Sequence, residues 1–192
     1  MVTKQAEEGL WYWGFLNDTG GIIGSIYYET SHAIILVDPL APTRDTGNQF
    51  WDALDNDIER TKRIPHIILT SDKNRRDTSI FIERYKSPVS HAWDPLSQVL
   101  IKQRFGSSIG FLPLLDTNES VIWLPDTSAL IVGRALHGAE NNTLTISKSL
   151  EARTVKTNNY FKTLEELKPR HVLTCIGPPV LKQGHQALRN LD

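Results

Sequence analysis

The sequence predicts an α+β protein built as a four-layer αββα sandwich, and three observations support this prediction. Segments with strand and helix patterns are mixed in both halves of the chain, without the regular βαβ alternation of a doubly wound sheet. Continuous aliphatic runs at 33–37 and 67–70 are typical of strands buried on both faces. Amphipathic patterns of helical period accompany them. Two sheets packed face to face, with helices outside, accommodate all three.

Length and composition are those of one globular domain. The chain has 192 residues, of which 40% are hydrophobic and 22% charged. We see no internal repeat and no low-complexity linker, so we expect a single domain over 1–192, with residues 1–9 frayed. The net charge of −1 gives no electrostatic reason to expect nucleic acid or an anionic membrane as a partner.

The cysteine content and the absence of long apolar runs indicate the compartment. Cys175 is the only cysteine, which excludes an internal disulfide and a cysteine-based metal cluster. The first residues carry Glu7 and Glu8 and no apolar stretch of the kind a secretory signal needs. No apolar run approaches the ~20 residues of a membrane span. We therefore expect a soluble, cytoplasmic protein.

The first half of the chain is expected to form strands and three helices. The turn-forming residues at 17–21 separate two strands, and the aliphatic run at 33–37 ends at Asp38-Pro39. Phe50, Trp51, Leu54 and Ile58 recur at helical spacing. The expected strands are 10–15, 22–29, 33–37, 67–70 and 87–92, and the expected helices are 47–62, 77–85 and 95–105.

The second half begins with β structure and ends with a helix. Residues 138–158 are polar and rich in asparagine, and their sequence favours no assignment. The expected strands are 110–115, 121–124, 130–132 and 171–175, with helices at 160–167 and 183–191. The residues expected in the core are Trp51, Leu54, Ile68, Ile122, Leu130, Ile131 and Leu173.

Aromatic residues gather in the first two strands. Because side chains alternate along a strand, Trp11, Trp13 and Phe15 share one face, and Tyr12 faces the other way. An aromatic face is most often core. Aromatic residues on both faces leave room for a partner surface.

The segment from His66 to Thr78 carries a family resemblance. An apolar run ends at Thr70, and a polar turn leads into a helix. In the metallo-β-lactamase superfamily a strand in this setting delivers the metal-binding motif H-x-H-x-D-H. This sequence resembles that superfamily but reads S-x-K-x-R-R at the same spacing. Ser71 and Lys73 stand at the first two histidine positions, Arg75 at the aspartate and Arg76 at the third histidine.

The resemblance extends over nearly the whole chain. The strand that ends in Asp38 is similar to the family strand whose aspartate buttresses the metal loop. The paired strands at 120–125 and 129–134 are similar to those that end in Gly-Asp, where the aspartate bridges two metals, and here that position is Arg134. Near the end, 173–179 is similar to the P-G-H-G-P-P strand end, with Ile176 in place of the histidine.

A further histidine of the family comes from a G-H-T motif, which can be placed in two ways. One alignment sets Asp116 at the histidine. The other sets Gly138 against the glycine and Ala139 at the histidine, and provides no ligand. Of the seven ligand positions, only Asp116 has a side chain suited to a metal. The resemblance therefore implies a metallo-β-lactamase-like fold without its metal, and we expect no cofactor and no metal-dependent hydrolysis.

The basic substitutions can be interpreted in three ways. Lys73, Arg75, Arg76 and Arg134 could form a pocket that binds a small anion. They could instead pair with Asp116 and other local carboxylates, satisfying buried charge, which we favour. In the third interpretation Arg75 and Arg76 lie along the next helix and point into water.

Two other residues are candidates for chemistry without a metal. His137 follows Arg134 closely and could act as an acid or base. Cys175 ends a strand beside Ile176, where it is expected to be a small buried hydrophobe rather than a nucleophile. The leading hypothesis is a non-catalytic binding or scaffold protein. The alternatives are a metal-independent hydrolase using His137 or Cys175 and an anion-binding module, and a homodimer is left open.

Overall fold

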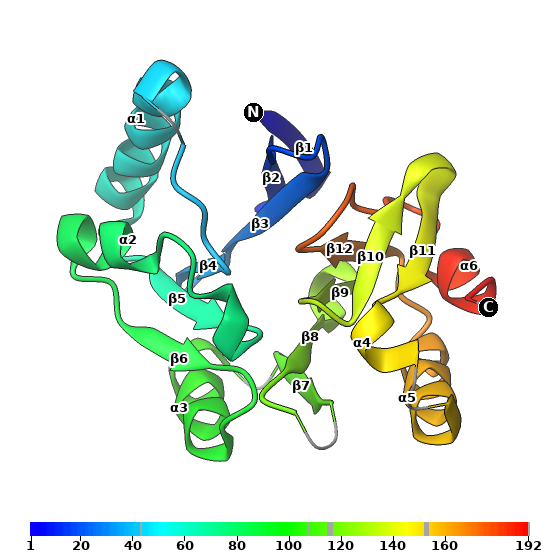
Figure 1. Ribbon diagram of the computed structural model, residues 1–192. Helices are drawn as coiled ribbons and strands as arrows, with labels where there is room; N and C mark the ends of the chain where they lie inside the picture. The colour runs from blue at the N-terminus through cyan, green and yellow to red at the C-terminus, as the bar shows by residue number, and fades with distance from the viewer. Residues whose placement is uncertain (43, 107, 115–116, 152–153, 192) are drawn as a thin grey trace.

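A computed structural model describes residues 1–42, 44–106, 108–114, 117–151 and 154–191, of which 44–47, 149, 151 and 154–157 are described by their backbone alone. Figure 1 shows strands stacked between two groups of helices, one on each outer side. No helix in this described part of the chain is long and apolar enough to cross a membrane.

The first sheet has six strands in the order β1-β2-β3-β4-β5-β6. The strands β1 to β4 are antiparallel neighbours, whereas β4, β5 and β6 run parallel. Parallel neighbours need crossover connections, and helices α1 and α2 supply them. The bounds are β1 Val2–Glu7, β2 Leu10–Leu16, β3 Ile22–Glu29, β4 Ile34–Val37, α1 Arg44–Thr61, β5 His66–Leu69, α2 Thr78–Tyr85, β6 Val89–His91 and α3 Pro95–Phe105.

The second sheet has four strands in the order β12-β9-β8-β7, and a separate hairpin, β10 and β11, follows β9. Strands β9 and β12 are parallel, and the other neighbours are antiparallel. The bounds are β7 Gly110–Pro113, β8 Ser120–Leu124, β9 Ala129–Val132, β10 Leu136–Ala139, β11 Thr143–Ile146, α4 Lys148–Glu151, α5 Thr154–Glu166, β12 His171–Thr174 and α6 Gly184–Arg189.

Three apolar clusters fill the spaces between the layers. The cluster between the sheets includes Ile26, Ile68, Ile122 and Leu173. A second cluster joins the four-stranded sheet to α5 and α6, and a third joins the six-stranded sheet to α1 and α2. Each sheet therefore buries both faces, which explains why its central strands are continuous aliphatic runs. The predicted α+β sandwich is confirmed.

Six of the seven residues expected in the core are buried, namely Leu54, Ile68, Ile122, Leu130, Ile131 and Leu173. Trp51 is only half-buried, so its assignment to the core is corrected. Its ring packs on Phe81 at 5.2 Å, and the Arg84 guanidinium lies 5.0 Å from the ring centroid on the solvent side of this cluster. At the edge of α1, the large Trp51 ring thus contacts both an apolar neighbour and a cation.

The N-terminal segment does not fray as expected, because residues 2–7 form β1. This strand pairs antiparallel with β2, and Ala6 is buried. The Glu7 carboxylate lies 2.9 Å from Nε2 of the buried His171, which fixes the end of β1 against β12. The unassigned 138–158 region contains the end of β10, β11, α4 and the start of α5.

Candidate functional site

The turn after β5 holds four of the residues that the resemblance places at metal-ligand positions. Ser71 caps a short 3₁₀ helix, Asp72–Asn74, and its buried hydroxyl accepts a hydrogen bond from the Lys73 main-chain N–H at 3.3 Å. Lys73 and Arg75 are exposed, whereas Arg76 is half-buried. The four positions therefore do not converge on one point.

Arg76 turns into the protein. Its φ of +38° lies in the left-handed region, which is uncommon for a residue with a side chain. The guanidinium donates three hydrogen bonds to main-chain carbonyls: Nη1 to Gly24 at 2.5 Å and to Asp38 at 3.2 Å, and Nη2 to Cys175 at 3.0 Å. These carbonyls come from β3 and from just past the ends of β4 and β12. Arg76 therefore ties the two sheets together at one end.

A buried carboxylate lies directly beside Arg76. Asp38 is 0% exposed, and its Oδ1 accepts from the Thr70 N–H at 2.8 Å. Its Oδ2 accepts from the Thr70 hydroxyl, from Asn74 Nδ2 at 2.9 Å and from Cys175 Sγ at 3.0 Å. Burial raises the pKa of Asp38, although Arg76, Cys175 and Thr70 favour the charged form. The buttressing position expected for Asp38 is thus the centre of a polar network.

Cys175 belongs to this network. The residue is fully buried, and its thiol donates to the Asp38 carboxylate. Burial, reinforced by the negative charge of Asp38, raises the pKa of Cys175 well above its usual range. Nucleophilic attack needs an accessible thiolate. This geometry therefore favours a structural role for Cys175.

A second carboxylate, Glu119, lies at this site, and no sequence motif identified it. Its Oε1 accepts the Arg134 main-chain N–H at 2.6 Å, and its backbone forms a β-bridge with Ser71. Burial raises the pKa of Glu119, and the nearby Asp38 acts in the same direction, whereas Arg134 and Lys73 oppose the shift. Glu119 therefore lies among the residues predicted to replace the metal ligands. It belongs to none of the family motifs, and its place just before β8 was the only available signal.

Arg134 and His137 lie close together at the turn from β9 into β10. Both are half-buried. Burial and the positive charge of Arg134 lower the pKa of His137, which favours the neutral imidazole. Asp116 falls outside the described residues, so its pairing with Arg134 stays a prediction.

Main-chain contacts surround the remaining predicted position, Ile176. Its carbonyl accepts from the Gly138 N–H at 2.8 Å, and its backbone bridges to Ile23 of β3. A Cβ at position 138 would lie 1.8 Å from the Pro178 carbonyl oxygen. Gly138 is therefore required by close backbone packing, whichever alignment of the G-H-T motif is adopted.

The described residues contain no group of three or more His, Cys, Asp or Glu side chains that could hold a metal ion. The Asp38 carboxylate is already hydrogen-bonded by its neighbours, and the Arg76 guanidinium lies beside it. A dication would have to displace those donors and would be repelled by the guanidinium. The residues present thus do not fit the metal centre that the resemblance would otherwise imply.

Neither protein-family models nor curated proteins match the sequence. Solved structures do match, at 11–14% identity for three of them, and each covers 98% of this chain. The metallo-β-lactamase from Pontibacter korlensis has a TM-score of 0.60, 11% identity and 99% of its own chain covered. That from Erythrobacter litoralis has a TM-score of 0.59, 12% identity and 92% covered. Rubredoxin oxygen:oxidoreductase from Desulfovibrio gigas has a TM-score of 0.62, 14% identity and 60% covered. This chain has the metallo-β-lactamase fold.

Proposed function

We propose that the protein is a non-catalytic member of this fold that acts as a binding or scaffold protein. The observation that carries the proposal is the position of Arg76, whose guanidinium is fixed by the carbonyls of Gly24, Asp38 and Cys175. In the resemblance, position 76 is a metal-binding histidine. A permanently charged side chain held beside Asp38 supplies the positive charge that a metal would supply, without a Lewis acid or an activated water.

The two alternative functions receive less support. A hydrolase that uses Cys175 would need a reactive thiolate, but that thiol is buried and donates to Asp38. An anion-binding module could not use Arg76, because its guanidinium is engaged by carbonyls. The charges of Arg134 and Lys73 both act on Glu119, which leaves the exposed Arg75 as the remaining cation of the predicted set.

Metal analysis tests the proposal directly. The purified protein is incubated with zinc, iron(II) or manganese, passed through a desalting column and analysed by inductively coupled plasma mass spectrometry. We expect well below one ion per chain, and no hydrolysis of β-lactam or ester substrates by the metal-treated protein. An Asp38→Ala, Glu119→Ala double variant serves as control for surface binding. About one ion per chain in the wild type, lost in this variant, would contradict the proposal.

A further inference from the structure

A second site lies on the other side of the six-stranded sheet. A cavity of about 470 Å³ opens between α1 and the outer face of β1, β2 and β3. Its walls include Trp11, Trp13, Tyr27 and Phe50, and its polar end includes Asp57 and Arg60. This volume and this mostly apolar lining are those of sites that bind small molecules. We call it the aromatic cavity.

Strand register places three of the four aromatic rings of the aromatic cavity together, and α1 supplies the fourth. Trp11 pairs with Tyr27 across β2 and β3, so their side chains share the outer face of the sheet. Trp13 is the next residue of that face, and its ring lies 5.5 Å from the Phe50 ring on α1. Trp13 is 3% exposed, whereas Trp11 is 37% exposed. A buried ring is thus joined to an accessible one.

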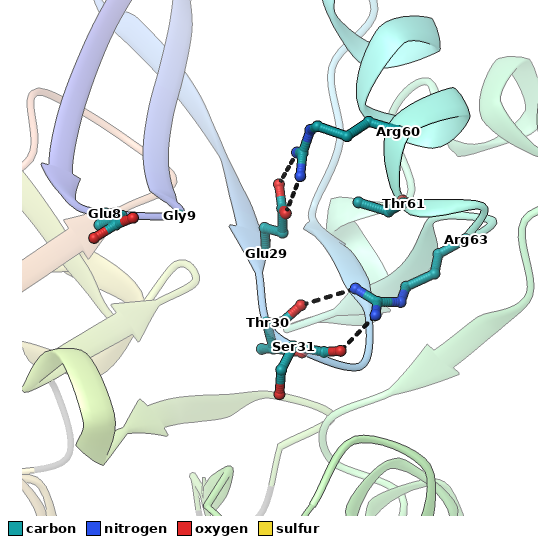
Figure 2. A pocket seen from close by; sticks show the side chains of 8 residues that line it. All are labelled: Glu8, Gly9, Glu29, Thr30, Ser31, Arg60, Thr61 and Arg63. Carbon is teal, nitrogen blue, oxygen red and sulfur yellow. Dashed lines mark hydrogen bonds and ion pairs between the residues drawn. The ribbon is translucent and has the colours of Figure 1, made fainter.

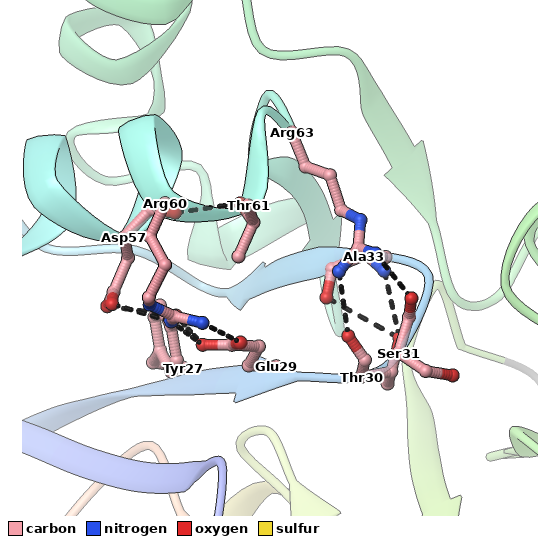
Figure 3. A network of polar contacts seen from close by, with 9 residues as sticks. All are labelled: Tyr27, Glu29, Thr30, Ser31, Ala33, Asp57, Arg60, Thr61 and Arg63. Carbon is pink, nitrogen blue, oxygen red and sulfur yellow. Dashed lines mark hydrogen bonds and ion pairs between the residues drawn. The ribbon is translucent and has the colours of Figure 1, made fainter.

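The polar end of the aromatic cavity has more acceptors than donors. Arg60 forms a bidentate pair with Glu29, at 2.9 and 2.6 Å, and also reaches Asp57 Oδ1 at 2.8 Å (Figure 3). The Tyr27 hydroxyl lies 2.8 Å from Glu29 and 3.0 Å from Asp57, and it has one hydrogen for both. Two carboxylates therefore share one guanidinium, and the lining side chains carry a net negative charge.

A more polar cavity of about 700 Å³ adjoins this end and shares Gly9, Glu29 and Arg60 with it (Figure 2). Its other guanidinium, Arg63, is directed at main-chain carbonyls and donates to Thr30 at 3.2 Å and Ser31 at 2.5 Å. Together the two cavities are lined by the carboxylates of Glu8, Glu29 and Asp57 and the guanidiniums of Arg60 and Arg63. The side chains of the combined lining therefore still carry one negative charge in excess.

We propose that the aromatic cavity binds a small organic cation, with an ammonium group on an aromatic or aliphatic body. The electron-rich ring faces attract a cation, and the excess carboxylate accepts its N–H groups. The body of the ligand replaces water along Trp11 and Phe50. The proposal concerns a site distinct from Arg76, and it stands whether or not the proposed function is correct.

Three probes of matched size separate charge from shape: 2-phenylethylamine, 2-phenylethanol and 3-phenylpropionate. Binding to the full chain is followed by the NMR signals of the Trp11 and Trp13 indole N–H groups, assigned with Trp→Phe variants. We expect the amine to bind about tenfold more tightly than the alcohol, and the carboxylate to bind most weakly. Equal binding of the amine and the carboxylate, or no shift with any probe at millimolar concentration, would overturn the proposal.

Two variants of α1 locate the charge that matters. Asp57→Asn should reduce the preference for the amine over the alcohol to about twofold or less. Asp52→Asn removes the same charge from an exposed position of α1 that lines neither cavity, and should leave the preference unchanged. Equal effects of the two variants would overturn the site assignment. Circular dichroism confirms that both variants are folded.

The alternative occupant of the aromatic cavity is a second copy of the chain. Sedimentation equilibrium of wild type and Trp11→Ala distinguishes the two cases. We expect the same molecular mass for both proteins, and weaker binding of all three probes by Trp11→Ala. A dimer that dissociates in Trp11→Ala would show that the cavity is a contact between subunits, and would overturn the ligand proposal.

Discussion

The guanidinium of Arg76 lies 3.0 Å from the main-chain carbonyl oxygen of Cys175, 99 positions further along the sequence. Through this contact the turn after β5 is joined to the end of β12, and the two sheets are held together at the end where the resemblance places a metal. The same guanidinium stands beside the fully buried Asp38. Removal of the Arg76 guanidinium leaves three carbonyl oxygens and the Asp38 carboxylate without their charged neighbour.

Replacing Arg76 by methionine should therefore destabilise the protein strongly. Met approximates the aliphatic length of Arg but donates no hydrogen bond, so three carbonyls lose a donor and Asp38 loses its nearby positive charge. We expect the free energy of unfolding to fall by about 3–5 kcal/mol at pH 7, measured by urea denaturation. The matched control is Arg75→Met at the exposed neighbouring position, where a change within about 0.5 kcal/mol is expected. Similar losses for both variants would refute the structural role of Arg76.

Arg134→Asp, which restores the family's aspartate, should destabilise the protein rather than restore metal binding. The new carboxylate would lie near Glu119, whose pKa is already raised by burial. A carboxyl group with a raised pKa in the folded state stabilises that state at low pH, and this contribution is lost as the pH rises through the folded pKa. We expect a loss of about 1–2 kcal/mol at pH 7 and a smaller loss at pH 4, from urea denaturation at both values.

Arg134→Gln is the control for this effect, because it removes the positive charge without adding a negative one. It should be less destabilising than Arg134→Asp at pH 7. Equal stability of the wild type and both variants would mean that the Arg134 side chain is solvated and does not affect Glu119.

His66 should make stability sensitive to mild acid. Its Nε2 lies 2.8 Å from the Ser90 hydroxyl, and its ring packs on Phe105. Burial, with a contribution from Arg104, lowers the pKa of His66 to about 4. The unfolded chain has an ordinary pKa of about 6.5 and binds more protons between these values, so stability falls as the pH decreases from about 6.5 to about 4.

The expected loss attributable to His66 is about 3 kcal/mol over that window. Urea denaturation of wild type and His66→Gln at several pH values measures this loss. The free energies of unfolding of the two proteins should approach each other as the pH decreases. His32→Gln, at an exposed position, should run parallel to the wild type. A His66→Gln curve parallel to the wild type as well would contradict the prediction.

The sequence predicted the layers of the fold well because the central strands bury both faces. The aliphatic runs that end at Val37 and Leu69 are strands on which no polar alternation is imposed. The polar segment of β1 was missed for the opposite reason: its stability comes from pairing with β2 and from the contact of Glu7 with His171. Such long-range partners leave no local pattern.

The types of residue at the candidate site were predicted more accurately than the positions of their side chains in space. Four basic residues were identified, but only tertiary contacts determine that Arg76 turns inward while Lys73 and Arg75 stay exposed. Glu119 matched no motif, and its importance follows from the main-chain N–H of Arg134 that it accepts. The role of each of these residues thus depends on its neighbours in space, which the residue type alone does not specify.

The contacts of Arg76 also bear on the order of folding events. Its carbonyl partners lie 52, 38 and 99 positions away along the chain, at Gly24, Asp38 and Cys175. Closing such long loops is slow and costs chain entropy, so the last of these contacts forms only after β12 has docked. Interactions made after the transition state change the unfolding rate and leave the folding rate nearly unaltered. We therefore expect Arg76→Met to shorten the lifetime of the native state more than it slows folding, which unfolding and refolding rates in urea would measure.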